Sequence, residues 1–284
     1  MPTLMVRYGE LGLKSPSVRR RFENALLDDI RRRHALARVP CVISTMRGRI
    51  FVDSDDWRKS CEILSHTFGV VSFSPVTRSV SDPEKLTQDT VEFARPLMFD
   101  GASFAIRSRR SGNHPYTSQT LAEALGAAVL KDNEAKHIHV SLDEPDVEIS
   151  VEVRDTLAFL FSSALAGPGG MPLGTQGRML CVIEDERGIA STWLMMKRGC
   201  SAIVSTKDLQ TLPVFDKWYP NLKSIDLQKD AMKQAAETEC IGVALSWNLD
   251  AIEKGALKGD LPAFYPLVGM NDEEVSALLA KIRA

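Results

Sequence analysis

The chain has 284 residues, of which 44% are hydrophobic and 25% charged, a composition typical of a soluble globular protein with two or three domains. The sequence shows neither an N-terminal signal peptide nor a stretch near the ~20 apolar residues of a membrane span, so we expect a cytoplasmic protein without a membrane partner. Its five widely spaced cysteines contain no CxxC pair, which excludes a zinc ribbon and a dithiol redox motif, and we expect buried, inert thiols.

The first predicted unit, residues 1–76, is basic: its first fifty residues hold eleven lysines and arginines but four acids, although the whole chain carries a net charge of −2. This excess favours an anionic polymer as a partner. Strands are predicted over 4–9, 41–45, 49–53 and 70–76, with helices after Pro16 and over 56–69. The resulting order, βαββαβ, is that of a ferredoxin-like domain.

The first helix is predicted to begin at the pair Ser15 and Pro16, because a serine side chain accepts unpaired amide hydrogens and a proline tolerates the first turn. Its buried face is an apolar stripe with a spacing of four residues: Val18, Phe22, Leu26 and Ile30. The arginines of this helix are expected mostly on the solvent side.

The second predicted unit covers residues 77–166. Helices are predicted over 86–98 and 117–130, and strands over 103–110, 137–142, 146–153 and 158–164. The twelve residues that follow Leu165 contain five glycines and two prolines, a loop composition that marks a linker over 167–177.

The third predicted unit covers residues 178–284 and alternates short apolar strands with helices. The strands are predicted over 179–183, 201–204, 241–245 and 263–267, and the helices over 190–199, 226–237, 248–257 and 271–282. Short apolar strands bounded by turns are typical of strands covered on both faces, so we predict a small parallel sheet with right-handed crossovers.

Several stretches of the chain resemble the tRNA 4-thiouridine synthase family of the ThiI type. In the family's order they read VRYGELGLKSPSVRRRFE, FGVVSFSPV, IRSRRSGNHPYTSQTLAEALGAAVL, PDVEISVEVRD, GPGGMPLGTQG and LVGMNDEEVSALLAKI, and together they cover nearly the whole chain. The resemblance implies a multidomain α/β and α+β fold: a ferredoxin-like domain over 1–76, a THUMP domain that binds tRNA over 77–166, and a PP-loop-like domain of the adenine nucleotide hydrolase type over 178–284. In the family this last domain adenylates the target uridine with ATP.

Arginines cluster at the end of the strand predicted over 103–110, beside a histidine and a tyrosine. Guanidinium groups bind phosphates and an aromatic ring stacks on an unpaired base, so this strand end is typical of RNA binding, although a solvated strand end fits the same residues. The three adjacent arginines of the first helix leave the same two interpretations open, because they point around the helix. The resemblance favours RNA binding. The predicted contacts are Lys14, Arg19, Arg20, Arg21, Arg107, Arg109, Arg110 and His114.

The family holds the phosphates of ATP in a Ser-Gly-Gly-x-Asp-Ser turn after a buried strand, where backbone amides and a helix N-terminus supply positive potential. This chain instead reads EDERGI over 184–189. Each carboxylate of Glu184, Asp185 and Glu186 would oppose a phosphate by roughly 1 to 4 kcal/mol at ~4 Å. We therefore expect ATP binding of the family's kind to be strongly disfavoured, and we prefer this interpretation to a magnesium ion that brings the nucleotide to the acids.

A second family stretch, TGE(x)LGQVASQT, aligns with LSWNLDAIEKGA over 245–256, where Ser246 and Gly255 replace family residues. Other positions keep the pattern: Leu194 and Met195 match a hydrophobic pair that lines the adenine pocket, and Lys229 matches a family lysine. Core packing and a solvated lysine explain these three residues as well. The predicted remnant of a nucleotide site is Glu184, Asp185, Glu186, Gly188, Leu194, Met195, Lys229, Ser246 and Gly255. No catalytic residue, metal ligand, bound cofactor or rhodanese domain is expected.

The leading hypothesis is a tRNA-binding protein that grips the acceptor end of tRNA with its first two domains and no longer adenylates. The alternative is an active tRNA sulfurtransferase with a rearranged nucleotide site, which would need ATP with magnesium. A third interpretation is an interaction role, in which the altered domain pairs with an active partner or with a second copy as a homodimer.

Overall fold

The computed structural model describes residues 2–9, 15–46, 48–228, 230–255, 257 and 259–284. The chain divides into two compact units, each built from several stretches. Unit 1 consists of Met1–Val6, Cys41–Trp57 and Phe73–Leu165, and unit 2 of Arg7–Pro40, Arg58–Ser72 and Ala166–Ala284. None of the helices in this described part of the chain has the length and apolarity that crossing a membrane requires.

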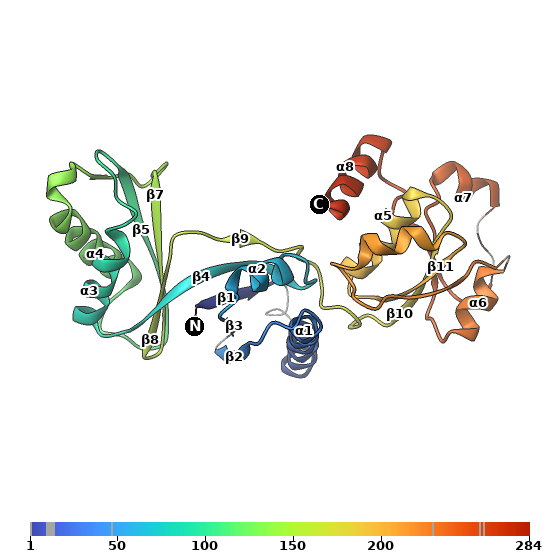
Figure 1. The fold of residues 1–284 in the computed structure, drawn as a ribbon, viewed down its shortest axis with the longest axis horizontal. Helices are drawn as coiled ribbons and strands as arrows, with labels where there is room; N and C mark the ends of the chain where they lie inside the picture. The colour runs from blue at the N-terminus through green and yellow to red at the C-terminus, as the bar shows by residue number, and fades with distance from the viewer. Residues whose placement is uncertain (1, 10–14, 47, 229, 256, 258) are drawn as a thin grey trace. The chain divides into compact units, whose positions relative to one another are not determined.

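The first six elements follow the predicted ferredoxin-like order βαββαβ (Figure 1). They are β1 (Thr3–Tyr8), α1 (Pro16–Leu36), β2 (Val42–Met46), β3 (Arg49–Asp53), α2 (Trp57–Ser65) and β4 (Val70–Val80). Strand β3 pairs antiparallel with both β1 and β2. The predicted order of elements is confirmed for this segment.

Helix α1 departs from its prediction near its start. Ser15 precedes the helix, but its side chain makes no capping hydrogen bond, so the predicted serine cap is wrong. Phe22, Leu26 and Ile30 are buried as predicted, whereas Val18 is only half-buried. The apolar stripe therefore packs from its second residue onward.

Arg33 continues the buried face of α1 and is an exception to the expected solvent exposure of the arginines. Its side chain is 3% exposed, and its Nε donates to Asp29 Oδ2 at 2.8 Å. Its two Nη atoms donate to the main-chain carbonyls of Lys217, at 2.8 Å, and Trp218. A buried guanidinium needs such complete pairing because an unpaired buried charge is costly. Arg33 therefore fastens α1 to a segment far along the chain within unit 2.

The elements that follow β4 complete a nine-stranded sheet. They are α3 (Pro83–Ala94), β5 (Ser103–Ser111), α4 (Ser118–Asp132), the 3-10 helix η2 (Glu134–Lys136), β6 (His139–Val140), β7 (Val147–Arg154), β8 (Leu157–Phe161) and β9 (Leu165–Ala166). The strand order is β2-β3-β1-β4-β8-β7-β5-β6, with β9 paired to β4. Helices α3 and α4 pack on one face of the β5, β7 and β8 part, in a core with Phe104 and Ile149. The strand predicted over 137–142 is only the two-residue β6.

Unit 2 contains a five-stranded parallel sheet, as predicted for the third part of the chain. Its elements are β10 (Arg178–Ile183), α5 (Glu186–Lys197), β11 (Ser201–Thr206), the 3-10 helix η3 (Leu209–Phe215), β12 (Lys223–Asp226), α6 (Ala231–Glu237), β13 (Val243–Ala244), α7 (Leu249–Gly255), β14 (Ala263–Phe264) and α8 (Asp272–Arg283). The strands lie in the order β12-β11-β10-β13-β14 and all run parallel. The prediction missed β12, an edge strand with no buried residue, and began a helix at 226 where α6 begins only at Ala231.

Apolar cores cover both faces of this parallel sheet. Helices α5 and α8 cover one face, and the core there includes Trp193 and Trp218. Phe68, which follows α2, joins the same core: its ring lies 5.5 Å from each of these two tryptophan rings. The other face carries Leu180 and Val182 beneath α6. The stretch Arg58–Ser72 is thus part of the packing of unit 2.

No disulfide joins the described cysteines, and Cys181, Cys200 and Cys240 are buried as predicted. Cys41 and Cys61 are only half-buried, which corrects the prediction for these two. Burial raises the pKa of the thiols of Cys61, Cys181, Cys200 and Cys240, which keeps these four groups protonated at neutral pH and therefore poorly reactive.

Candidate functional site

The predicted acidic turn joins β10, a buried strand in the middle of the parallel sheet, to helix α5. Asp185 is the N-cap of α5, and its Oδ1 accepts a hydrogen bond from the amide of Gly188 at 3.1 Å. Aspartate is a preferred N-cap residue because its carboxylate satisfies an amide hydrogen that has no partner within the helix. The Asp185 side chain therefore occupies the end of the helix at which an anion such as a phosphate would otherwise bind.

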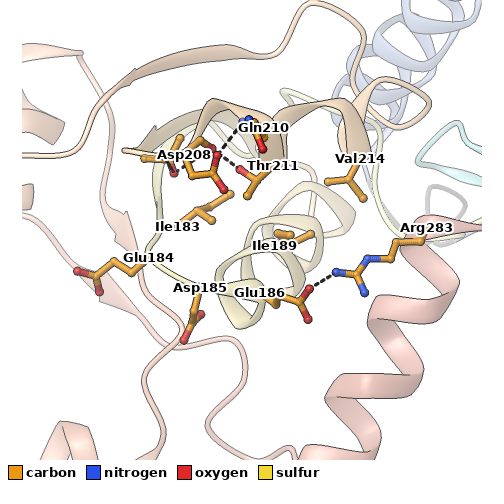
Figure 2. Close-up of a pocket in the computed structure, with 11 residues that line it drawn as sticks. Ile183, Glu184, Asp185, Glu186, Ile189, Asp208, Gln210, Thr211, Val214 and Arg283 are labelled. Carbon is orange, nitrogen blue, oxygen red and sulfur yellow. Dashed lines mark hydrogen bonds and ion pairs between the residues drawn. The ribbon is translucent and has the colours of Figure 1, made fainter.

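The other two carboxylates of the turn have different surroundings, as Figure 2 shows. The Glu186 side chain turns toward Arg283, the last residue of α8, and pairs with it at 2.5 Å. Glu184 is exposed and makes no hydrogen bond or ion pair with any residue that the structure describes. The turn thus contains one capping carboxylate, one ion-paired carboxylate and one carboxylate in solvent.

A cavity of about 400 Å³ lies at the carboxyl ends of β10 and β11, beside the acidic turn (Figure 2). Ile183, Ile189 and Val214 supply its apolar surface, and Thr206 and Asp208 bring polar groups from the end of β11. The carboxyl ends of parallel strands are where α/β proteins commonly bind their ligands. The cavity is therefore the place to look for whatever the parallel sheet of unit 2 binds.

The polar groups of this cavity are hydrogen bonded to one another. Asp208 caps η3, because its Oδ1 accepts from the Gln210 amide at 2.9 Å, and its own amide donates to Thr206 Oγ1 at 3.1 Å. Thr211 Oγ1 donates to the Asp208 carbonyl at 2.8 Å. Sequence reasoning missed these residues, although a signal was present: polar side chains follow directly after the buried strand β11.

Gly188 has a packing role at the junction of β10 and α5. A Cβ atom at this position would lie 2.8 Å from the Cα atom of Ile183 and 3.0 Å from the carbonyl oxygen of Val182. Both neighbours are backbone atoms of the strand and cannot move aside as the end of a side chain can. Glycine therefore allows the helix to approach the strand this closely.

The structure does not bring the other described residues of the predicted nucleotide site to this cavity. Leu194 is half-buried and Met195 is buried, and both pack in the core along α5. Ser246 is half-buried just after β13, and Gly255 is exposed at the end of α7. Lys229 lies outside the described residues. Sequence order alone could not show that these positions separate in space.

The second predicted site is the end of β5, in unit 1. The alternation of side chains along the strand places Ile106 in the core beneath the helices and Arg107 and Arg109 on the opposite face. Arg107 is already engaged: its Nε lies 3.2 Å from Glu148 Oε2, and its Nη2 donates to the Leu142 carbonyl. The guanidinium group of Arg107 therefore already has two partners within the protein.

The next two arginines are less restrained. Arg109 is exposed, and no described residue forms a hydrogen bond or an ion pair with it. Arg110 is exposed as well, and its Nη1 donates to the Gly112 carbonyl at 3.2 Å. Gly112 turns the chain with a φ of +110°, which favours glycine. Two guanidinium groups at this strand end are therefore accessible to an anion.

Two aromatic rings stack on each other in the segment that follows β5. The rings of His114 and Tyr116 have centroids 5.4 Å apart and planes inclined by 15°. The Tyr116 hydroxyl donates to the Ser81 carbonyl at 2.8 Å, and His114 Nε2 lies 3.2 Å from the Ser111 carbonyl oxygen. Burial raises the pKa of Tyr116, so its hydroxyl stays protonated and continues to donate. Sequence reasoning named His114 for this site but omitted its stacking partner Tyr116.

The α1 arginines belong to unit 2. Arg19 is half-buried, whereas Arg20 and Arg21 are exposed. Adjacent helical residues point in different directions, so these three cannot all face one ligand. Lys14 lies outside the described residues. The α1 arginines and the end of β5 are therefore two separate groups of candidate contacts.

Comparison with known proteins finds two family matches in tandem, a ThiI ferredoxin-like domain over residues 3–74 and a THUMP domain over residues 80–163. The probable tRNA sulfurtransferase of Methanobrevibacter smithii is 39% identical over 208 residues, which cover 70% of this chain and 52% of the relative. The protein of the same description from Thermoanaerobacter sp. strain X514 is 28% identical over 333 residues, which cover 98% of this chain and 85% of the relative. The chain spans about half the length of the archaeal relatives it matches.

Two solved structures share the fold. PH1313 from Pyrococcus horikoshii Ot3 has a TM-score of 0.84 at 24% identity, and the match covers 100% of both chains. A 4-thiouridine synthetase in complex with RNA and bound ATP has a TM-score of 0.77 at 19% identity, covering 99% of this chain and 85% of that one. Each match shows a shared fold over all or nearly all of this chain. The chain therefore belongs to the ThiI-type, THUMP-domain family.

Proposed function

We propose that this protein binds tRNA through its THUMP domain, residues 77–166, and through the basic segment near its N-terminus. The observation that carries the proposal is the end of β5, where exposed Arg109 and Arg110 are followed in the chain by the stacked rings of His114 and Tyr116, within the segment that matches a THUMP domain. The relatives described as probable tRNA sulfurtransferases, and the related structure with bound RNA, support tRNA as the RNA concerned.

The proposed contact is with the unpaired acceptor end of tRNA. Guanidinium groups bind phosphates and fix the orientation of the RNA, while a stacked ring pair offers a flat face to an unpaired base. Stacking of one base on an aromatic side chain contributes about 1–3 kcal/mol. Because phosphate contacts release bound counterions, we expect an affinity that falls steeply as the salt concentration rises.

Fluorescence anisotropy titrations of the full chain with a labelled tRNA and with an unrelated hairpin RNA test this proposal. We expect tighter binding of tRNA, and about tenfold or more weaker binding after Arg109→Ala together with Arg110→Ala, with the salt slope reduced by about 2. Arg95→Ala is the matched control, because Arg95 is an exposed THUMP-domain arginine that pairs with Asp132. Equal affinity for both RNAs, unchanged in the double variant, would contradict the proposal.

We further propose that the domain over residues 178–284 does not adenylate. A triphosphate at the N-terminus of α5 would meet the Asp185 carboxylate in place of a free amide hydrogen, with Glu184 and Glu186 close by in sequence. Each carboxylate opposes a phosphate by roughly 1 to 4 kcal/mol at ~4 Å, and the pairing of Glu186 with Arg283 offsets one of the three. The residues present therefore do not fit a triphosphate held at this helix end.

The second candidate function is that of an active tRNA sulfurtransferase with a rearranged nucleotide site. The observation that favours it is the cavity of about 400 Å³ at the carboxyl ends of β10 and β11, which offers room for a ligand beside the altered turn. A relative described as a probable tRNA sulfurtransferase also aligns with 98% of this chain. This function would require ATP with magnesium, bound in a manner different from a helix N-terminal cradle.

Equilibrium dialysis with ATP and magnesium, followed by an assay of tRNA-dependent pyrophosphate release, separates the two candidates. Our proposal expects neither binding nor release. The alternative expects both, with turnover lost in Lys229→Ala and retained in Lys223→Ala, the matched control, since Lys223 is an exposed lysine of the edge strand β12. Release that depends on Lys229 would overturn our proposal for this domain.

We also infer a role for the altered domain in association, as a homodimer or with an active partner, in the cytoplasm where tRNA is modified. A domain that keeps its fold without its original ligand retains surfaces that can serve a partner. Sedimentation velocity at increasing protein concentration tests the homodimer directly. A chain that remains monomeric throughout, and that recovers no partner in a pull-down, argues against association.

A further inference from the structure

We propose that unit 2 has a second ligand site, distinct from the acidic turn, that binds a small aromatic compound carrying a carboxylate. The site is a cavity of about 500 Å³ near the start of β10, where Met179 contributes to its lining. Met179 and Ile183, which borders the cavity of the acidic turn, are four residues apart along the strand, or ~13 Å at the usual rise. The two cavities thus lie toward opposite ends of the same strand.

One wall of this cavity is the glycine-rich linker, which is tied to the end of α5 and the start of β11 by main-chain hydrogen bonds. The Met171 amide donates to the Lys197 carbonyl at 3.0 Å, and the Gln176 amide donates to the Gly199 carbonyl at 3.0 Å. The approach is so close that a Cβ atom at Gly170 would lie 2.1 Å from the carbonyl oxygen of Lys197. The wall is therefore part of the packed structure of unit 2.

The lining favours an aromatic ring. Three methionines, Met171, Met179 and Met195, line the cavity together with Phe264 and Tyr265. Thioether sulfur is polarisable and makes favourable contacts with aromatic rings, and methionine adapts its shape to a ligand. A volume of about 500 Å³ lies within the range of small-molecule sites, which are mostly apolar with a few polar groups.

The aromatic wall is held in place before any ligand binds. The ring of Tyr265 stacks on that of Trp247, with centroids 5.9 Å apart and planes inclined by 25°. The Tyr265 hydroxyl accepts a hydrogen bond from the Leu257 amide at 3.3 Å. Phe264 is 38% exposed and Ile241 is 49% exposed, so the apolar surface of the cavity is open to solvent. Covering such surface with a ligand is favourable by the hydrophobic effect.

Arg198 supplies the positive charge for the carboxylate. It is the C-cap residue of α5, it lines the cavity, it is exposed, and its guanidinium makes no hydrogen bond or ion pair with any described residue. A helix C-terminus carries only about half an elementary negative charge, which the full charge of the guanidinium exceeds. A planar guanidinium binds a carboxylate through two parallel hydrogen bonds. Gln176, also at the cavity, offers amide hydrogens beside it.

A single arginine selects a ligand with one negative charge. A nucleoside triphosphate would bring several negative charges to one guanidinium, with an apolar lining around the rest, so the cavity does not suit it. An uncharged aromatic compound would gain only apolar contacts with the lining and would form no ion pair with the Arg198 guanidinium. A ring with one carboxylate uses both the apolar lining and Arg198. The site needs no RNA, so its failure would leave the proposed tRNA binding unaffected.

Isothermal titration calorimetry of the full chain with naphthalene-2-carboxylate tests the site, with naphthalene-2-carboxamide as the uncharged analogue. We expect the carboxylate to bind, and the carboxamide to bind about tenfold or more weaker. Arg198→Gln should weaken carboxylate binding by a similar factor. Arg178→Gln is the matched control, because Arg178 is an exposed arginine at the start of β10 that lies outside the cavity lining. The Arg178→Gln variant should bind naphthalene-2-carboxylate with the same affinity as the unaltered chain.

A second variant tests the cavity itself. Ile241→Trp places a large ring at a half-exposed position of the lining and should abolish binding of the carboxylate while the thermal unfolding midpoint stays close to that of the unaltered chain. The proposal is overturned if the carboxylate does not bind at about 1 mM, if the carboxamide binds as well as the carboxylate, or if binding survives both Arg198→Gln and Ile241→Trp.

Discussion

The ends of β5 and β10 differ in how many of their charged groups are bonded within the protein. At the end of β5, Arg109 is exposed without a partner among the described residues. At the end of β10, Asp185 is bonded to its own helix and Glu186 to Arg283. The end of a strand therefore indicates where a ligand site lies. Which ligand that site can bind depends on the charged side chains that have no partner within the protein.

The largest effect on stability is expected at Gly188. A glycine that is needed only for the close approach of a ligand tolerates alanine when the ligand is absent, whereas a glycine that is needed for packing does not. Gly188→Ala should lower the free energy of unfolding by roughly 1–3 kcal/mol, since the new methyl group meets two backbone atoms of β10. The gain in helix propensity, about 1 kcal/mol at most, does not offset that cost. Urea unfolding followed by tryptophan fluorescence measures the change.

Gly255→Ala is the control for this prediction, because a Cβ atom at Gly255, in helix α7, meets no atom of the described residues within 4 Å. We expect it to be neutral or slightly stabilising. Equal stability of the two alanine variants would show that Gly188 is not needed for packing. The turn of β10 would then have to be considered again as a site built for a ligand.

A smaller effect is expected at the helix cap. Asp185→Ala removes the acceptor of the Gly188 amide and should cost about 1 kcal/mol of stability. Asp185→Asn keeps an acceptor oxygen at the same place and should cost much less, as measured by the same urea unfolding. If asparagine is as destabilising as alanine, the negative charge and not the cap is what the fold requires at this position.

The smallest effect is expected for the ion pair between Glu186 and Arg283. Both side chains are largely exposed, with 68% and 48% of their surfaces accessible, and exposed pairs contribute at most about 1 kcal/mol. Glu186→Gln should therefore shift the urea midpoint only slightly and leave tRNA affinity unchanged. A double-mutant cycle with Arg283→Gln isolates the pair, and a coupling energy well above 1 kcal/mol would contradict this view of the turn.

Local patterns predict most of the fold. Strand β10 and helix α5 follow from a short apolar run and from apolar residues spaced along one helix face, both of which depend on near neighbours. Strand β12 escapes the same reasoning because an edge strand of four residues, none of them buried, has no apolar signal. The serine cap of α1 fails for a related reason, since the residue type permits a hydrogen bond that the conformation of Ser15 does not make.

The candidate sites are harder to predict, because their contents depend on partners far along the chain. The acidic turn reads as three equivalent carboxylates, and only the structure separates Asp185, which bonds locally, from Glu186, whose partner is 97 residues away. Asp208 joins the same cavity from the segment between β11 and η3. Arg107 reads as a phosphate ligand until Glu148 and the Leu142 carbonyl are found beside it.

The contacts of Arg33 limit where the protein can be divided into fragments that still fold. A fragment that starts at the predicted boundary of residue 178 would lose the donor to the carbonyls of Lys217 and Trp218, and it would also lose Phe68 from beside the tryptophans. Those losses leave two main-chain carbonyls without their donor and remove a buried phenylalanine from the core, and the latter loss alone costs about 3–5 kcal/mol in comparable cases. Shortened versions meant to fold should therefore retain α1 and the stretch Arg58–Ser72 together with the parallel sheet.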